Sequence, residues 1–132
     1  MKHQDLDKFT YAYCECALWS THDYNEEDSE GIEMLDANYG IEDISNECLA
    51  QMAADCADFR ANNEDLEAAY ARNDEHFYYG PAQAGYDFWL TREGHGAGFW
   101  DRGLGEVGER LSALARPYGS FGLYSYEGEV RH

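Results

Sequence analysis

The carboxylates between positions 23 and 31 are the residues best placed to do chemistry, because they have the density of a calcium-binding loop. An EF-hand loop needs glycine at its sixth position and a bidentate acid at its twelfth. When Gly31 takes the sixth position, Ala37 takes the twelfth, and alanine has no ligand to offer. We therefore interpret the stretch as a solvated acidic loop and predict no metal or cofactor.

The four cysteines are a second candidate for chemistry: Cys14, Cys16, Cys48 and Cys56. Zinc sites pair their ligands across gaps of two to four residues, and Cys14-x-Cys16 does not fit that spacing. Residues 1–8 are polar and charged, with no apolar segment of a secretion signal behind them. We expect free, buried thiols in the reducing cytoplasm of a bacterial host cell.

Gly94-His95-Gly96-Ala97-Gly98 has the glycine content of a phosphate-binding loop. It lacks the glycine spacing and the strand–loop–helix setting that such loops require. A glycine-rich hairpin with a lone turn histidine is the better interpretation, since no second titratable group stands at a telling distance from His95. No catalytic residue is predicted, and we do not expect an enzyme.

Arg92 and Arg102 flank the aromatic residues Trp89, Phe99 and Trp100, a combination that could stack on single-stranded nucleic acid. The net charge of −18 opposes that function, because binding to phosphates needs cations. We predict instead that the rings pack across strands, with arginine stacked over them.

The negative charge is concentrated in the first part of the chain. Residues 1–80 hold 20 acidic and 4 basic side chains, a net charge of −16, whereas residues 81–132 hold 7 and 5, a net charge of −2. The acidity could serve solubility, or it could reflect a halophilic source, since the chain has only two lysines. Neither explanation requires the acids to be concentrated in one half. Such acidity repels nucleic acid and anionic membranes and favours a basic protein, a polyamine or a metal ion as partner.

Helices are predicted to position most of these acids. Apolar spacing predicts a helix over 6–19 capped by Asp5 or Asp7, although alternation over 9–13 leaves a strand open. Residues 22–38 are predicted to form a loop, with a short turn at 34–35 and a further turn at 38–40. Ser45 is the predicted cap of a second helix, which the Asn62-Asn63 pair would break near position 61.

Gly80-Pro81 begins a part of different composition. We predict a strand over 86–91, a turn at 92–95, a strand over 96–100, a helix over 104–118, a strand over 120–126 and a final turn at 127–128. The expected fold is α+β in one domain, 1–132: an acidic, mainly helical half, 1–80, packed on a small antiparallel β-β-α-β half, 81–132.

The run YDFWLTREGHGAGFWDR at 86–102 resembles a signature of small acidic proteins encoded by bacteriophages and other mobile elements. Residues 36–44, DANYGIEDI, resemble a second patch of the same group, and the likeness covers roughly two thirds of the chain. The group is similar to sequences from which some anti-CRISPR proteins come, several of which act by resembling DNA. The resemblance implies that the aromatic segment is scaffold and the acidic half is the working surface.

Our leading hypothesis is a phage-encoded inhibitor that mimics DNA. Its partner would be the basic DNA-binding surface of a host complex, with a CRISPR surveillance complex foremost, and it would bind neither nucleic acid nor membrane directly. Carboxylates on neighbouring helix turns lie several ångströms apart, while duplex DNA presents a charge every ~1.7 Å along its axis. The predicted contact residues are Asp23, Glu26, Glu27, Asp28, Glu30, Glu33, Glu42, Asp43, Asp55, Asp58, Glu64 and Asp65.

Two alternatives stay open. The first is a structural or regulatory phage protein that binds a partner through exposed aromatic residues, with Trp89 and Trp100 as candidates. The second is an enzyme that uses His95 or His22 with nearby acids.

Overall fold

The computed structural model describes residues 5–24, 33–75 and 77–132. Its helices are α1 (Lys8–Ser20), α2 (Asn46–Arg60), α3 (Glu64–Tyr70), α4 (Pro81–Arg92) and α5 (Glu106–Ala115), and its strands are β1 (Tyr124–Tyr126) and β2 (Glu129–Arg131). Short 3₁₀ turns are η2 (Leu35–Ala37), η3 (Ile41–Asp43), η4 (Phe99–Asp101) and η5 (Arg116–Tyr118). The α+β class is therefore observed, with a small sheet.

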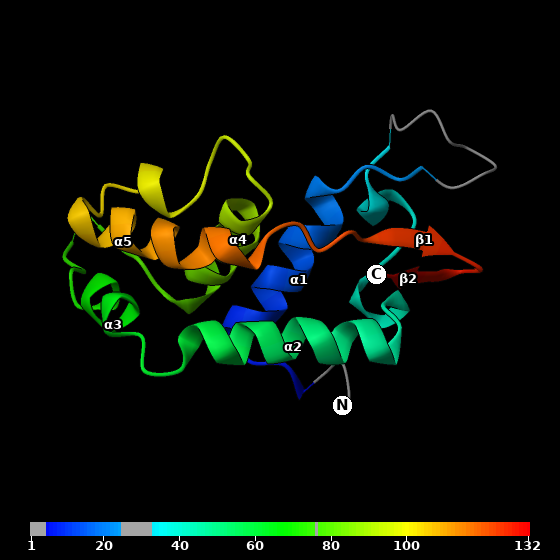
Figure 1. Ribbon diagram of the computed structural model, residues 1–132, viewed down its shortest axis with the longest axis horizontal. Coiled ribbons are helices and arrows are strands. Elements are labelled where there is room, and N and C mark those ends of the chain that lie inside the picture. Colours follow the sequence, from blue (N-terminus) through cyan, green and yellow to red (C-terminus); the bar gives the residue numbers. More distant parts are fainter. Residues whose placement is uncertain (1–4, 25–32, 76) are drawn as a thin grey trace.

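The helices form the body of the molecule, and the sheet lies at one end of it. Helix α1 packs most extensively against α4, and α2 runs along one side (Figure 1). Helices α3 and α5 lie toward one end of α2, and the β1–β2 hairpin lies toward the other (Figure 1). The backbone N–H of Ser45 donates to the carbonyl of Val130 at 2.9 Å, which ties the hairpin to the start of α2.

Local capping chemistry sets the helix starts in the first half. The Asp7 carboxylate accepts from the Thr10 N–H at 2.8 Å, and the Ser45 hydroxyl accepts from the Cys48 N–H at 3.2 Å. Asn63 caps α3 in the same way, so the predicted break between two helices is confirmed. The predicted first helix, its Asp7 cap and the turn at 34–35, which starts η2, are also confirmed.

The predicted strand over 86–91 is wrong, because these residues belong to α4. Pro81 follows Gly80 at the first helical position, where its fixed φ favours a helix. Every residue from 87 to 92 is buried, the polar ones included, so the segment lacks the one-sided pattern of a surface helix. A short apolar run buried on all sides does not reveal its period.

The β-β-α-β order is consequently wrong as well. No return strand forms at 96–100, because residues 96–98 lead into η4, which contains Phe99 and Trp100. Arg92 is the last residue of α4, and a turn follows it at residues 93–94. The predicted third helix is confirmed as α5 with η5. Only residues 124–126 of the predicted last strand are paired, in an antiparallel hairpin that joins Tyr124 to Arg131 and Tyr126 to Glu129. The predicted final turn at 127–128 closes that hairpin.

Aromatic side chains fill the core where α1, α2 and α4 meet. The rings of Phe59 and Phe88 stack with centroids 4.2 Å apart, and Tyr13 stacks on Phe88 at 5.3 Å. Gly85 lets α4 approach α1 this closely, since a Cβ there would lie 2.1 Å from the Phe9 carbonyl oxygen. One buried cluster contains side chains from both 1–80 and 81–132.

Replacing Gly85 with alanine is expected to destabilise the protein by about 1–3 kcal/mol, because α1 and α4 must separate to admit the methyl group. Gly96→Ala is the matched control, since a Cβ at Gly96 meets open space. Its effect should stay within ~0.5 kcal/mol. Urea unfolding followed by far-UV circular dichroism measures both, and equal stability of the two variants would contradict the packing described.

Candidate functional site

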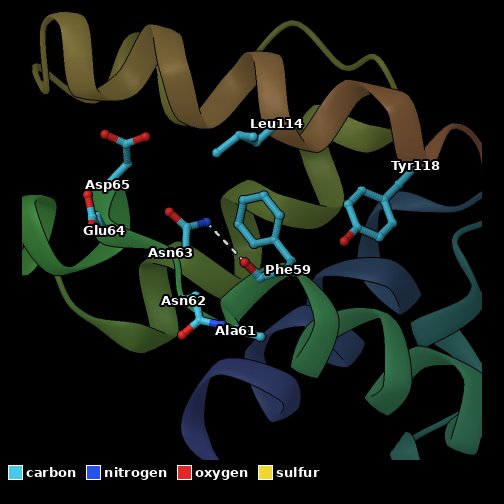
Figure 2. A pocket seen from close by; sticks show the side chains of 8 residues that line it. All are labelled: Phe59, Ala61, Asn62, Asn63, Glu64, Asp65, Leu114 and Tyr118. Atoms are coloured by element: carbon cyan, nitrogen blue, oxygen red, sulfur yellow. Dashed lines mark hydrogen bonds between the residues drawn. The ribbon is translucent and has the colours of Figure 1, made fainter.

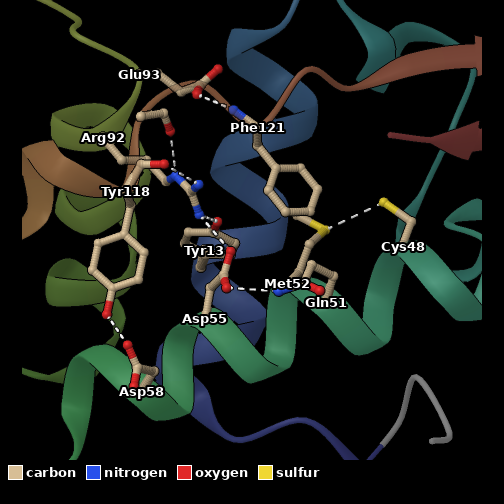
Figure 3. A network of polar contacts seen from close by, with 11 residues as sticks. Tyr13, Cys48, Gln51, Met52, Asp55, Asp58, Arg92, Glu93, Tyr118 and Phe121 are labelled. Carbon is tan, nitrogen blue, oxygen red and sulfur yellow. Dashed lines mark hydrogen bonds and ion pairs between the residues drawn. The ribbon is translucent and has the colours of Figure 1, made fainter.

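Asp55 is a predicted contact residue that the fold turns inward. Its carboxylate accepts from the Arg92 guanidinium at 2.8 Å, and the two side chains are only 17% and 5% exposed. Arg92 also donates to the Tyr13 hydroxyl at 3.0 Å and to the carbonyls of Tyr118 and Gly119 at 3.0 and 2.8 Å (Figure 3). Burial acts to lower the pKa of Arg92, but Tyr13 and Asp55 together raise it above its usual value. The hydrogen bonds of Arg92 connect α1, α2, α4 and η5, so Asp55 stabilises the buried core.

Asp23 is internal too. It is 5% exposed, and its carboxylate accepts from the Ser125 hydroxyl at 2.6 Å, which links the segment after α1 to β1. The Asp23 carboxylate could pair with a partner's cations only by breaking its hydrogen bond to the β1–β2 hairpin. We therefore leave Asp23 and Asp55 out of the contact surface.

Four of the predicted acids, together with Glu47, are at least partly exposed and lie on α2 or beside its two ends. We call Asp43, Glu47, Asp58, Glu64 and Asp65 the acidic edge. Glu47 and Asp58 are eleven residues apart, three helical turns, and so lie on the same face of α2. Helix α2 has 15 residues and is ~22 Å long, with η3 at one end and α3 at the other (Figure 1).

Most of the acidic edge has no cationic partner. Asp65 pairs with Arg110 at 2.8 Å, whereas no Lys or Arg in residues 5–24, 33–75 and 77–132 forms an ion pair with the other four. Asp43 accepts from the Gly40 N–H at 2.8 Å, and Asp58 accepts from the Tyr118 hydroxyl. Within the part of the chain that the structure describes, four of the five carboxylates thus present negative charge without a cationic partner, two of them on α2.

Glu47 was missing from the predicted set, although its eleven-residue distance from Asp58 is a signal that the sequence contains. Glu33 is exposed and accepts from the Asn38 amide at 3.2 Å, away from α2. Glu42 is exposed and lines a separate cavity beside α1. Glu26, Glu27, Asp28 and Glu30 lie outside the described residues.

A cavity of about 310 Å³ opens at the carboxyl end of α2 (Figure 2). It is lined by Phe59, Ala61, Asn62, Asn63, Glu64, Asp65, Leu114 and Tyr118. Its apolar part comes from Phe59, Tyr118 and the half-exposed Leu114, and two acids of the edge stand beside them. An apolar wall next to carboxylates suits a long basic side chain, whose stem is apolar and whose end is charged.

The run at 86–102 is held by internal contacts. Asp87 is fully buried and accepts from the Tyr79 hydroxyl at 2.6 Å and from Arg102 at 2.9 Å. Burial raises the pKa of its carboxyl, against the lowering effect of these hydrogen bonds. The Thr91 hydroxyl accepts from the Phe99 N–H at 3.3 Å. Arg92 lies over the rings of Phe88, Tyr118 and Phe121, so the predicted packing of arginine over Trp89, Phe99 and Trp100 across strands is wrong.

His95 lies exposed in the turn after α4, where its backbone N–H donates to the Leu90 carbonyl at 3.0 Å. Among the described residues, no group of three His, Cys, Asp or Glu side chains is arranged to hold a metal ion. The acid-rich stretch from 25 to 31 lies outside that search.

All four cysteines are buried and free, as predicted. Burial raises the pKa of Cys14, Cys16 and Cys48 to about 12, and it raises that of Cys56 as well. Cys48 and Met52 bring their sulfurs within 3.9 Å of each other (Figure 3). The thiols therefore stay protonated at neutral pH and act as small apolar side chains.

In comparisons with protein-family models, curated proteins and solved structures, nothing matches this chain. None of the helices among the described residues combines the length and apolar character needed to cross a bilayer.

Replacing Asp55 with alanine should lower the free energy of unfolding by about 3 kcal/mol, because it leaves the buried Arg92 without its counter-charge. Asp58→Ala, one helical turn away and exposed, should cost less than ~1 kcal/mol. Urea unfolding at pH 7 compares the two variants. Similar losses would contradict the different roles given to these neighbouring acids.

Stability is expected to fall as the pH rises from about 9 toward 12. The thiols have a pKa near 9 in the unfolded chain and about 12 in the folded protein. Below pH 9 the protonated thiols make their full contribution to the stability of the folded state. Between pH 9 and 12 they ionise only in the unfolded chain, which progressively stabilises the unfolded state. Urea midpoints in reductant at pH 7.5, 9.5 and 10.5 measure the slope. A Cys14→Ala variant should show a shallower slope, and an unchanged slope would contradict this origin.

Proposed function

We propose that this protein mimics nucleic acid and inhibits a protein whose basic surface binds DNA. The observation that supports this most strongly is the acidic edge, four of whose five carboxylates have no cationic partner in the part of the chain that the structure describes. Clustered like charges repel one another and cost stability. Lysines and arginines of a partner would relieve that repulsion on binding.

The rigidity and length of the edge favour a nucleic-acid channel as the surface it fills. Helix α2 fixes Glu47 and Asp58 on one face, and its ~22 Å length corresponds to roughly two thirds of a helical turn of DNA. A protein that tracks DNA over such a distance places several cations along it. The cavity beside Glu64 and Asp65 would receive one long basic side chain at the end of that track.

We base the proposed target class on the resemblance of the run at 86–102 to phage and mobile-element proteins. A mobile element gains from blocking a host defence, and a CRISPR surveillance complex must bind DNA through a basic channel to act. We accordingly propose an anti-CRISPR inhibitor that acts in the host cytoplasm by occupancy, without catalysis. Surface pairs of this kind are screened beyond a Debye length of ~8 Å at physiological salt, so binding should weaken as salt rises.

A phage interaction module that binds through aromatic residues is the second candidate. It is favoured by a set of large side chains that are 46% to 77% exposed: Tyr11, Trp19, Tyr24, Tyr78, Trp100, Tyr124 and Tyr126. Trp89 does not belong to this set, because it is 1% exposed and donates to the Ser20 hydroxyl at 2.9 Å. Trp100, at 50% exposure, is the residue whose replacement tests this function.

Reversing three charges of the acidic edge should abolish most of the binding. A tagged protein is first used to capture its target from a host lysate at low salt, and affinities are then measured with the purified target. The triple variant Glu47→Lys/Asp58→Lys/Glu64→Lys should bind about 100-fold more weakly, equivalent to roughly 1 kcal/mol per site.

The matched control reverses three exposed acids of the second half, Glu106, Glu109 and Glu127, and should change affinity less than ~3-fold. Circular dichroism verifies the fold of both variants. Binding that is indifferent to salt and to the edge variant would refute mimicry. Loss of binding on Trp100→Ala alone would instead favour the aromatic module.

A further inference from the structure

A second cavity, of about 250 Å³, lies beside α1, and no residue of the acidic edge lines it. Three separate segments build it. Helix α1 contributes Tyr11, Glu15 and Trp19, which are spaced four residues apart and so share one face. Helix α4 contributes Tyr86, and the segment from η2 to η3 contributes the remaining wall.

Aromatic rings dominate the walls of this cavity. Tyr11, Trp19, Tyr39 and Tyr86 all line it. The rings of Trp19 and Tyr86 stand nearly perpendicular, at 82°, with centroids 6.5 Å apart, and Trp19 and Tyr11 are each 46% exposed. Aromatic faces carry negative electrostatic potential, so several rings around one small space attract a cation.

Carboxylates complete the same space. Glu15, Asp36 and Glu42 line it, all three exposed, and no Lys or Arg forms an ion pair with any of them in the described residues. Partial burial and then the charge of Glu15 raise the pKa of the Tyr86 hydroxyl, which therefore stays neutral. Leu18 and Ile41, both buried, supply an apolar contact for methylene groups.

We infer that this cavity binds the side chain of an arginine presented by a partner protein. The aromatic rings can stack on the flat guanidinium cation, and the carboxylates can accept from its forked N–H donors. The apolar wall can contact the methylene stem. A lysine ammonium fits less well, because it is more strongly hydrated and cannot stack as a plane. The inference rests on the proposed function, since it names one contact with the basic partner.

The test uses the intact protein and N-acetyl-arginine methylamide as the probe, with the indole N–H signals of the three tryptophans as reporters in ¹H–¹⁵N NMR spectra. Trp19→Phe and Trp100→Phe variants assign the signals. The Trp19 signal should move saturably with a dissociation constant of about 1–10 mM, as suits one side chain. Trp100, equally exposed but outside the cavity, is the internal control and should not move.

The citrulline analogue keeps the shape of arginine and removes its charge, and the lysine analogue keeps the charge and removes the plane. Both should bind at least fivefold more weakly, and the Glu15→Gln/Glu42→Gln variant should bind arginine roughly tenfold more weakly. An unmoved Trp19, equal binding of either analogue, or equal movement of Trp100 would overturn the inference. The buried Trp89 signal reports whether each variant keeps its fold.

The two proposals fail separately. The edge variant Glu47→Lys/Asp58→Lys/Glu64→Lys leaves every residue of this cavity intact and should bind the arginine analogue within about twofold of the parent protein. A cavity that does not bind the analogue would overturn this inference while the effect of the edge variant on target binding still stood. Loss of analogue binding in the edge variant would show that the cavity is not an independent site.

Discussion

The guanidinium of Arg92 sits inside a chain whose net charge is −18, and four hydrogen bonds connect it to three other segments. Taking a cation and its counter-charge out of water is costly, so the pair with Asp55 contributes little net stability by itself. Removing either partner is far worse, because the other charge would be left buried and unpaired. Helix α2 is therefore locked to α1, α4 and η5 in one arrangement.

That constraint divides the acids of α2 into two kinds. Asp55 points into the fold and neutralises Arg92, while Glu47 and Asp58 point outward from the same helix. Because α2 is fixed, the outward carboxylates are held at fixed spacing, and a partner does not have to order them on binding. The concentration of charge in the first half then has a structural meaning as well as a proposed function, since one carboxylate holds the scaffold and its neighbours form the edge.

Short-range rules were enough to predict part of this architecture. The Asp7 and Ser45 caps and the break at Asn62-Asn63 depend on residues within four positions of one another, so the sequence reveals them. Helix α4 depends on long-range packing, because Arg92 is buried against partners 37 and 79 residues away in the sequence. A helix segment buried on all sides has no separate apolar and polar faces, so its sequence lacks the 3.6-residue periodicity that identifies a helix.

The same limit applies to the candidate site. The sequence indicated which half holds the acids, but not that Asp23 and Asp55 have internal partners 102 and 37 residues away. It also gave no reason to group Tyr86 with Tyr11 and Trp19, which meet only because α1 packs on α4. The sequence shows which residues of one helix share a face, whereas only the structure shows which two helices pack together.

If the acidic edge occupies the place of DNA on the target, this protein and DNA must compete for the same surface. The captured target is incubated with labelled duplex DNA, and increasing amounts of this protein are added. Mimicry predicts complete displacement of the DNA, with an apparent inhibition constant that rises in proportion to the DNA concentration. A ternary complex of target, DNA and this protein, or inhibition independent of the DNA concentration, would show that the acidic edge does not mimic DNA.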